Sequence, residues 1–109
     1  DKSSCDYPVY GAAVAKAVAS GECDRGIVIC TTGIGSSITA NKVKGIRCAL
    51  CGDPVSARLT REHNDANMLA MGAAIIGESV ALNIVDIFLD TEFSGVDRHQ
   101  RRVDLIEQC

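Results

Sequence analysis

One segment, residues 26–37, constrains the fold of this chain more than any other. It reads Gly-Ile-Val-Ile-Cys-Thr-Thr-Gly-Ile-Gly-Ser-Ser. The apolar run at residues 27–29 has no polar alternation, which favours a strand buried on both faces, as in a parallel sheet. The glycines that follow let the backbone come close to a ligand, and N–H groups at the start of the next helix can face an anion. The segment therefore predicts an α/β fold whose chemistry lies just after a strand that ends in Cys30.

Helix-like and strand-like segments alternate along the rest of the chain. This alternation predicts a three-layer, Rossmann-like parallel sheet flanked by helices, in a single domain over residues 1–109. Three readable strands are few for such a sheet, so we expect either a partner on its open edge or N-terminal strands that are missing from this chain. The expected helices lie between Asp6 and Gly21 and over residues 36–44, 53–62, 78–89 and 97–108, and the expected strands cover 26–30, 46–51 and 68–76, with a polar loop at 63–67.

Composition excludes several classes of protein. Hydrophobic residues make up 47% of the chain, enough for a core, which must be largely aliphatic because the chain has two Phe, two Tyr and no Trp. A net charge of -3 argues against a nucleic-acid surface. No apolar run approaches the roughly 20 residues that span a bilayer, and no signal peptide is visible. We therefore expect a cytoplasmic protein with no nucleic-acid or membrane partner.

The six cysteines fit a reducing compartment better than a disulfide framework, because three of them lie in apolar, strand-like runs. Cys48 and Cys51 have the spacing of a metal or redox pair. No second pair exists and no helix start follows directly, so two small core residues of a strand are favoured over zinc or thioredoxin chemistry. Electron transfer or metal storage through the cysteines is a more distant alternative. We expect no metal site.

Five motifs resemble, in order and spacing, those of the ribose-5-phosphate isomerase B family, which includes the galactose-6-phosphate isomerase subunits. The resemblance implies an enzyme without cofactor that interconverts ribose 5-phosphate and ribulose 5-phosphate. It also implies a homodimer or homotetramer with sites shared between subunits. Family members begin with a strand and a turn that this chain lacks, and with them an aspartate and a histidine that resemble substrate-binding and ring-opening groups. The motifs are Asp6-Tyr-Pro8, Cys30-Thr-Thr-Gly-Ile-Gly35, Ala40-Asn-Lys-Val-Lys-Gly-Ile-Arg47, Arg61-Glu-His-Asn-Asp-Ala-Asn67 and Arg98-His-Gln-Arg-Arg-Val103.

The chemistry of an aldose–ketose isomerase suits the glycine-rich loop. The reaction moves a proton between C1 and C2 through an enediolate, so it needs one base over both carbons and donors for the developing oxyanion. The resemblance makes Cys30 this base, and a thiol near a helix N-terminus tends to ionise; the alternative is a buried strand-end cysteine. Thr32 aligns with a loop hydroxyl that contacts the reacting oxygens, or it caps the loop. Backbone N–H groups of Gly33, Gly35 and Ser36 would complete the anion hole.

The remaining candidates lie far from this loop in the sequence. His63 and Asn64 resemble a pair that reaches the sugar ring, often in the neighbouring subunit's site, where a neutral imidazole can move a proton during ring opening. Tyr7 aligns with a substrate-contacting tyrosine, or it packs the first helix. Arg98 and Arg102, four residues apart, match two phosphate-binding arginines whose forked guanidinium groups suit phosphate oxygens. The alternative for this pair is a solvated, charged helix.

Two positions depart from the family pattern. Thr31 stands where glycine is usual, and it would cost about 1–3 kcal/mol if its φ were positive. Ala74 stands where a third arginine usually follows the last strand, which points to weaker phosphate binding or another sugar. A galactose-6-phosphate or allose-6-phosphate isomerase, as a subunit, is therefore an alternative, although galactose-type relatives tend to lose the His63–Asn67 pattern. A non-catalytic sugar-phosphate-binding or partner subunit is another.

Overall fold

The strands of the molecule form one parallel sheet. The computed structural model describes residues 6–109, so Cys5 lies outside the described residues. Strands β1 (Gly26–Cys30), β2 (Cys48–Leu50) and β3 (Met68–Gly72) lie in the order β1-β3-β2, and β1 pairs with β3 from Gly26↔Met68 to Cys30↔Gly72. The predicted Rossmann-like parallel sheet is therefore confirmed.

The strand order corrects the expectation that β1 is buried on both faces. β3 is the central strand and all five of its residues are buried. β1 lies at an edge of the sheet, where Val28 is buried but Ile29 is 59% exposed. Within residues 6–109, β1 pairs with β3 alone. The apolar run of β1 therefore lies in an edge strand, and no other described strand pairs with its outer side.

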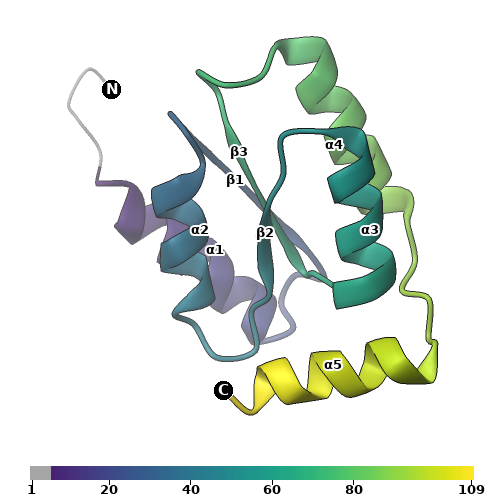
Figure 1. Ribbon diagram of the computed structural model, residues 1–109. Coiled ribbons are helices and arrows are strands. Elements are labelled where there is room, and N and C mark those ends of the chain that lie inside the picture. Colours follow the sequence, from purple (N-terminus) through teal and green to yellow (C-terminus); the bar gives the residue numbers. More distant parts are fainter. Residues whose placement is uncertain (1–5) are drawn as a thin grey trace.

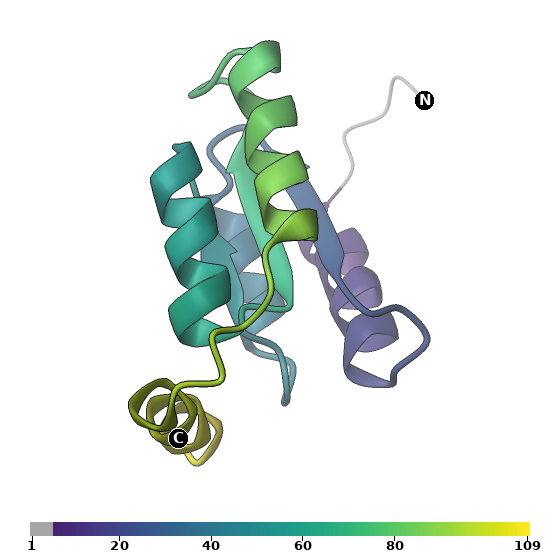
Figure 2. The same ribbon diagram turned by 90° about the vertical axis from the view of Figure 1, so that its right-hand side faces the viewer.

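Helices cover both faces of the sheet (Figures 1 and 2). Helices α1 (Tyr7–Ala19) and α2 (Ile34–Asn41) pack together on one face, and α3 (Pro54–Asn64) and α4 (Glu78–Asp90) pack together on the other. The last helix, α5 (Asp97–Glu107), packs against α3. No helix within residues 6–109 is long and apolar enough to cross a membrane.

Two apolar cores lie on either side of β3, because alternate residues of a strand point to opposite faces. Met68 and Ala70 belong to the core beneath α1 and α2. Leu69 and Met71 belong to the core beneath α3 and α4, which also contains the fully buried Phe88. The single central strand therefore holds both layers of helices together.

Several element ends differ by a few residues from the sequence-based prediction, and two of these differences lie in the segments after β2. The expected polar loop at 63–67 begins later, because α3 continues through His63 and Asn64. Asp65 ends the helix in a left-handed conformation with φ 46°, which short polar side chains tolerate. β3 ends at Gly72, and the apolar residues up to Ile76 form a turn rather than more strand.

Candidate active site

Cys30 lies at the carboxyl end of β1, directly before the turn that opens α2. The helix begins at Ile34, two residues earlier than expected, because its N-cap Gly33 adopts φ 81°. The N–H of Gly33 donates to Cys30 Sγ at 3.1 Å. The hydroxyl of Ser36 beside the thiol lowers the pKa of Cys30 most strongly; burial opposes this shift, and the backbone N–H groups of Ser36, Gly33 and Thr32 add to it. The loop therefore favours the thiolate of Cys30.

Thr32 is exposed at the tip of the same loop. Its Oγ1 accepts a hydrogen bond from the N–H of Ile34 at 3.2 Å. This contact is the capping interaction expected as the alternative role of Thr32. An exposed hydroxyl can make a second hydrogen bond, so the contact leaves its proton available to a ligand.

The end of β3 braces the loop from the side. The N–H of Ala73 donates to the carbonyl of Cys30 at 2.8 Å, and the N–H of Ala74 donates to the carbonyl of Thr31 at 3.0 Å. A Cβ at Gly72 would lie 2.5 Å from the carbonyl carbon of Thr32, so only glycine fits there. Ala74, where an arginine was expected, is therefore a direct neighbour of the cysteine loop.

The strain that a positive φ would cause at Thr31 does not arise. Among residues 6–109, Asp65 is the one non-glycine residue with positive φ. Thr31 therefore adopts a backbone conformation that a β-branched residue tolerates, and its carbonyl is held by the turn after β3.

A cleft of about 580 Å³ opens beside Cys30 between α1, β1 and the start of α2. Tyr7 and Tyr10 of α1 line one side, and Thr31 and Ser36 line the other. Tyr7 is half-exposed, and its ring lies against Gly35. The structure thus brings Tyr7 and the residues of the glycine loop together around the thiol.

The other candidates lie at the opposite end of the sheet. His63 and Asn64 end α3 shortly before Met68, the residue that pairs with Gly26 at the start of β1. Cys30 is at the other end of β1, and four steps of 3.3 Å per residue place it about 13 Å from Gly26. Arg98 and Arg102 are exposed on α5, which packs against α3, and Figure 1 shows α5 beyond the starts of the strands. One chain therefore carries two separate clusters of candidate residues.

Sequence reasoning missed one member of the second cluster. His99 is buried on α5, and its ring centroid lies 4.4 Å from that of His63. Its Nδ1 lies 2.7 Å from Ser94 Oγ. The pKa of His99 is lowered, mainly by burial and then by the charges of His63 and two neighbouring arginines. The sequence signal that could have made His99 a candidate was its position between Arg98 and Arg102, within the motif at residues 98–103.

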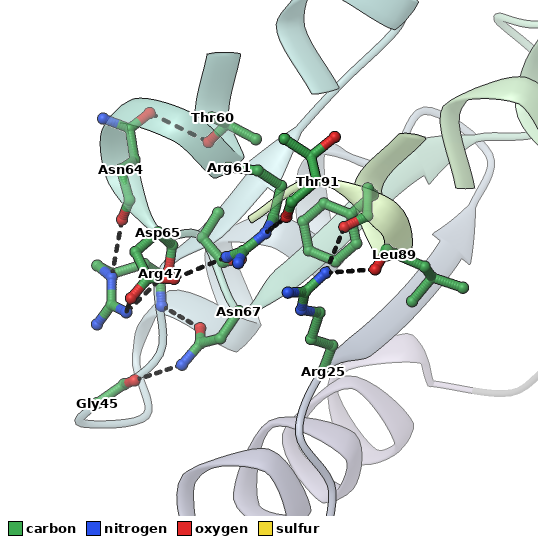
Figure 3. A network of polar contacts seen from close by, with 12 residues as sticks. Arg25, Gly45, Arg47, Thr60, Arg61, Asn64, Asp65, Asn67, Leu89 and Thr91 are labelled. Atoms are coloured by element: carbon green, nitrogen blue, oxygen red, sulfur yellow. Dashed lines mark hydrogen bonds and ion pairs between the residues drawn. The ribbon is translucent and has the colours of Figure 1, made fainter. Parts of the chain in front are cut away.

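Two arginines, the partly buried Arg47 and the buried Arg61, hold the end of α3 in place (Figure 3). Arg47 donates from Nε to the carbonyl of Asn64 at 3.0 Å and from Nη2 to the carbonyl of Asp65 at 2.8 Å. Arg61 donates to the carbonyls of Thr91 at 2.9 Å and Ala66 at 2.8 Å. These contacts supply hydrogen bonds to backbone carbonyls at the ends of helices and in the segments next to them, which would otherwise lack a partner. They fix the backbone that presents the second cluster.

The Cys48–Cys51 pair is built differently from Cys30. Cys48 is the first residue of β2, and Cys51, which is buried, directly follows the end of that strand. Burial raises the pKa of Cys48 to about 12 and that of Cys51 to about 11. Protonated thiols are poor metal ligands and poor nucleophiles. All five cysteines in the described part of the chain are free.

Comparisons with known proteins agree with this architecture. Residues 1–106 match the family described as Ribose/Galactose Isomerase. Ribose-5-phosphate isomerase B of Escherichia coli is 52% identical, over 93% of this chain and 67% of its own length. The galactose-6-phosphate isomerase subunit LacB of Clostridium acetobutylicum is 43% identical, over 94% of this chain and 59% of its own length. The structure of Clostridium thermocellum ribose-5-phosphate isomerase B superposes with a TM-score of 0.94 at 58% identity, covering 96% of this chain and 70% of that one.

The fold and these similarities define an aldose–ketose isomerase that acts on sugar phosphates. The chain belongs to the Ribose/Galactose Isomerase family.

Proposed function

We propose that this chain interconverts ribose 5-phosphate and ribulose 5-phosphate through an enediolate, with Cys30 as the base. The observation that carries the proposal is the thiol environment: Gly33 N–H lies 3.1 Å from Sγ, and Ser36 lowers the pKa of the thiol beside an open cleft. The similarity to ribose-5-phosphate isomerase B supports the choice of a pentose phosphate.

In the proposed reaction the thiolate of Cys30 removes the proton from C2 of the open-chain aldose. The electron pair of that C–H bond forms the C1=C2 double bond, and O1 takes up the negative charge of the enediolate. The thiol then returns the proton to C1 while the O2 proton moves to O1, which leaves a carbonyl at C2. The hydroxyl of Thr32 and the N–H groups of Gly35 and Ser36 are the donors for the developing charge. Tyr7 contacts the substrate from the other wall of the cleft.

Ring opening and phosphate binding are assigned to the second cluster. His63 moves a proton between the ring oxygen and the C1 hydroxyl, and Asn64 binds the sugar. Arg98 and Arg102 bind the phosphate. Because one chain holds this cluster at the opposite end of the sheet from Cys30, a complete site requires a second chain. We therefore propose a homodimer or homotetramer with sites shared between subunits.

Hybrid oligomers test the shared site. We expect Cys30→Ala and His63→Ala each to abolish ribose 5-phosphate turnover. Mixed after denaturation and refolding, the two variants form hybrids in which one site receives Cys30 from one chain and His63 from the other. Activity should therefore reappear, to about a quarter of the unaltered specific activity for random dimers. Failure of mixed samples to regain activity, with both variants oligomeric, would refute the shared site.

A hexose phosphate is the second candidate substrate. Ala74 removes a cation next to the cysteine loop, and a galactose-6-phosphate isomerase subunit is among the relatives. Measuring kcat/KM for ribose 5-phosphate, allose 6-phosphate and galactose 6-phosphate decides between them. We expect ribose 5-phosphate to be preferred, and Ala74→Arg to lower its KM. Binding without turnover of all three would indicate a non-catalytic subunit.

A further inference from the structure

His99 is a buried imidazole that the proposed mechanism does not use. It is 7% exposed, although its neighbours on α5 are exposed. Burial of a polar ring requires a hydrogen-bonding partner, and Ser94 Oγ provides one at 2.7 Å from Nδ1. The same hydroxyl accepts a hydrogen bond from the N–H of Val96 at 3.2 Å. Ser94 thus holds the ring from a fixed stretch of backbone.

The ring held in this way contacts His63. Their centroids lie 4.4 Å apart, with an angle of 38° between the ring planes. The N–H of Ser94 donates to the carbonyl of Glu62 at 3.2 Å, one residue before His63. The side chain of His63 is exposed, and an exposed side chain without packing occupies several rotamers. The contact with His99 restricts that freedom.

The charges around His99 favour a neutral ring. His63 and Glu62 face it from α3, and Arg98 and Arg102 face it from α5. Burial lowers the pKa of His99 most, the three basic groups lower it further, and Glu62 opposes them. A proton on His99 would lie beside these three basic groups, so the neutral form of His99 is favoured.

We propose that His99 is a positioning residue, whose Ser94-anchored ring orients the imidazole of His63. His63 would then begin the proton transfer of ring opening from a fixed orientation. This inference rests on the proposed function for the role of His63 and adds a residue on which that role depends.

Nuclear magnetic resonance tests the contact between the two rings without any assay of activity. The chain contains two histidines, so imidazole spectra of the ¹⁵N-labelled protein contain two rings. We expect the pKa of His99 to lie below the ordinary value of 6.5. His63→Phe, which removes one of the charges that lower the pKa of His99, should raise that pKa, whereas Gln100→Ala, a control on the same helix, should leave it unchanged. A His99 titration curve unchanged by His63→Phe would overturn the proposal.

A comparison of two reactions tests the positioning role. Ribose 5-phosphate is mostly a closed ring, which the enzyme must open before it removes the proton. Ribulose 5-phosphate is open-chain, so the enzyme can exchange its carbon-bound proton for deuterium from D₂O without ring opening. In His99→Phe we expect kcat for ribose 5-phosphate to fall about tenfold or more at unchanged KM, with deuterium exchange retained. Ser94→Ala, which keeps both rings, should lower kcat in the same direction and provides the test if His99→Phe does not fold.

A purely structural role of His99 would give a different pattern. Displacement of α5 would move the phosphate-binding candidates Arg98 and Arg102, so KM would rise in both reactions, and this result would contradict the proposal. If the unaltered chain turns over no pentose phosphate, the proposed function fails, while the titration of His99 still decides whether its ring contacts His63.

Discussion

The ring of Tyr7 lies directly against the backbone of Gly35. A Cβ placed on Gly35 would stand 2.5 Å from the Tyr7 hydroxyl oxygen and equally close to a ring carbon. Gly35 lies in the first turn of α2, and Tyr7 is the first residue of α1. The absence of a side chain on one helix therefore allows the aromatic ring of the other to form a wall of the cleft that contains Cys30.

Gly35→Ala tests this contact. The methyl group would displace the Tyr7 ring, and such overpacking costs about 1–3 kcal/mol of unfolding free energy. We expect a lower melting temperature and reduced ribose 5-phosphate turnover. Adding Tyr7→Ala to Gly35→Ala should recover stability, because it removes the clash. Gly52→Ala is the control, since its Cβ would meet no atom within 4 Å; equal losses in the two glycine variants would contradict the account.

Thiol labelling tests the pKa of Cys30. Its pKa lies below the ordinary value of 9.0, whereas those of Cys48 and Cys51 are raised to about 12 and about 11. Because the thiolate is the reactive form, iodoacetamide at pH 7.5 should modify Cys30 well before the other two, as peptide mapping by mass spectrometry would reveal. As pH rises, the Cys30 rate should reach half of its plateau value below pH 9.

Ser36→Ala provides the control for the labelling experiment. Ser36 is the largest of the influences that lower the pKa of Cys30. Its removal should shift the rate profile of Cys30 to higher pH and leave Cys48 and Cys51 unchanged. An unshifted profile would mean that the hydroxyl does not stabilise the thiolate.

Arg61 is expected to contribute far more to stability than Arg58, three residues earlier on α3. The side chain of Arg61 is 4% exposed and binds Asp65 and two backbone carbonyls, whereas that of Arg58 is 51% exposed and pairs with Glu62. Arg61→Met would leave the buried carbonyls unpaired, at about 3 kcal/mol. Arg58→Met should cost less than about 1 kcal/mol. Urea denaturation of both variants measures the difference, and equal costs would contradict it.

Local sequence signals predicted much of the fold and the position of half of the candidate residues. The glycines around Cys30 require a turn between strand and helix, so the position of the thiol followed from the residues themselves. That β1 lies at an edge could not be predicted in this way, because apolar residues look alike in edge and central strands until strand order is known. The first turn of α2 was also missed, since it depends on the positive φ of Gly33.

The second half of the site depends on tertiary structure. A single histidine on a charged helix such as α5 gives no sign that it is buried, and the partner of His99 is 36 positions earlier in the chain. The separation of His63 from Cys30 likewise follows from strand register, which pairs the residues after α3 with the start of β1. The family resemblance made Cys30 and His63 candidates for one kind of site. The structure places them in two separate clusters of the same chain.

The assignment of Cys30 as the base is tested most directly by Cys30→Ala, assayed for conversion of ribose 5-phosphate to ribulose 5-phosphate and for equilibrium binding of the substrate. Cys23→Ala, which removes an exposed cysteine outside the cleft, is the control. We expect Cys30→Ala to lose turnover by about 10²–10⁴-fold, the usual contribution of a general base, while binding stays within a few-fold and Cys23→Ala remains fully active. Near-normal turnover by Cys30→Ala would show that another group removes the proton.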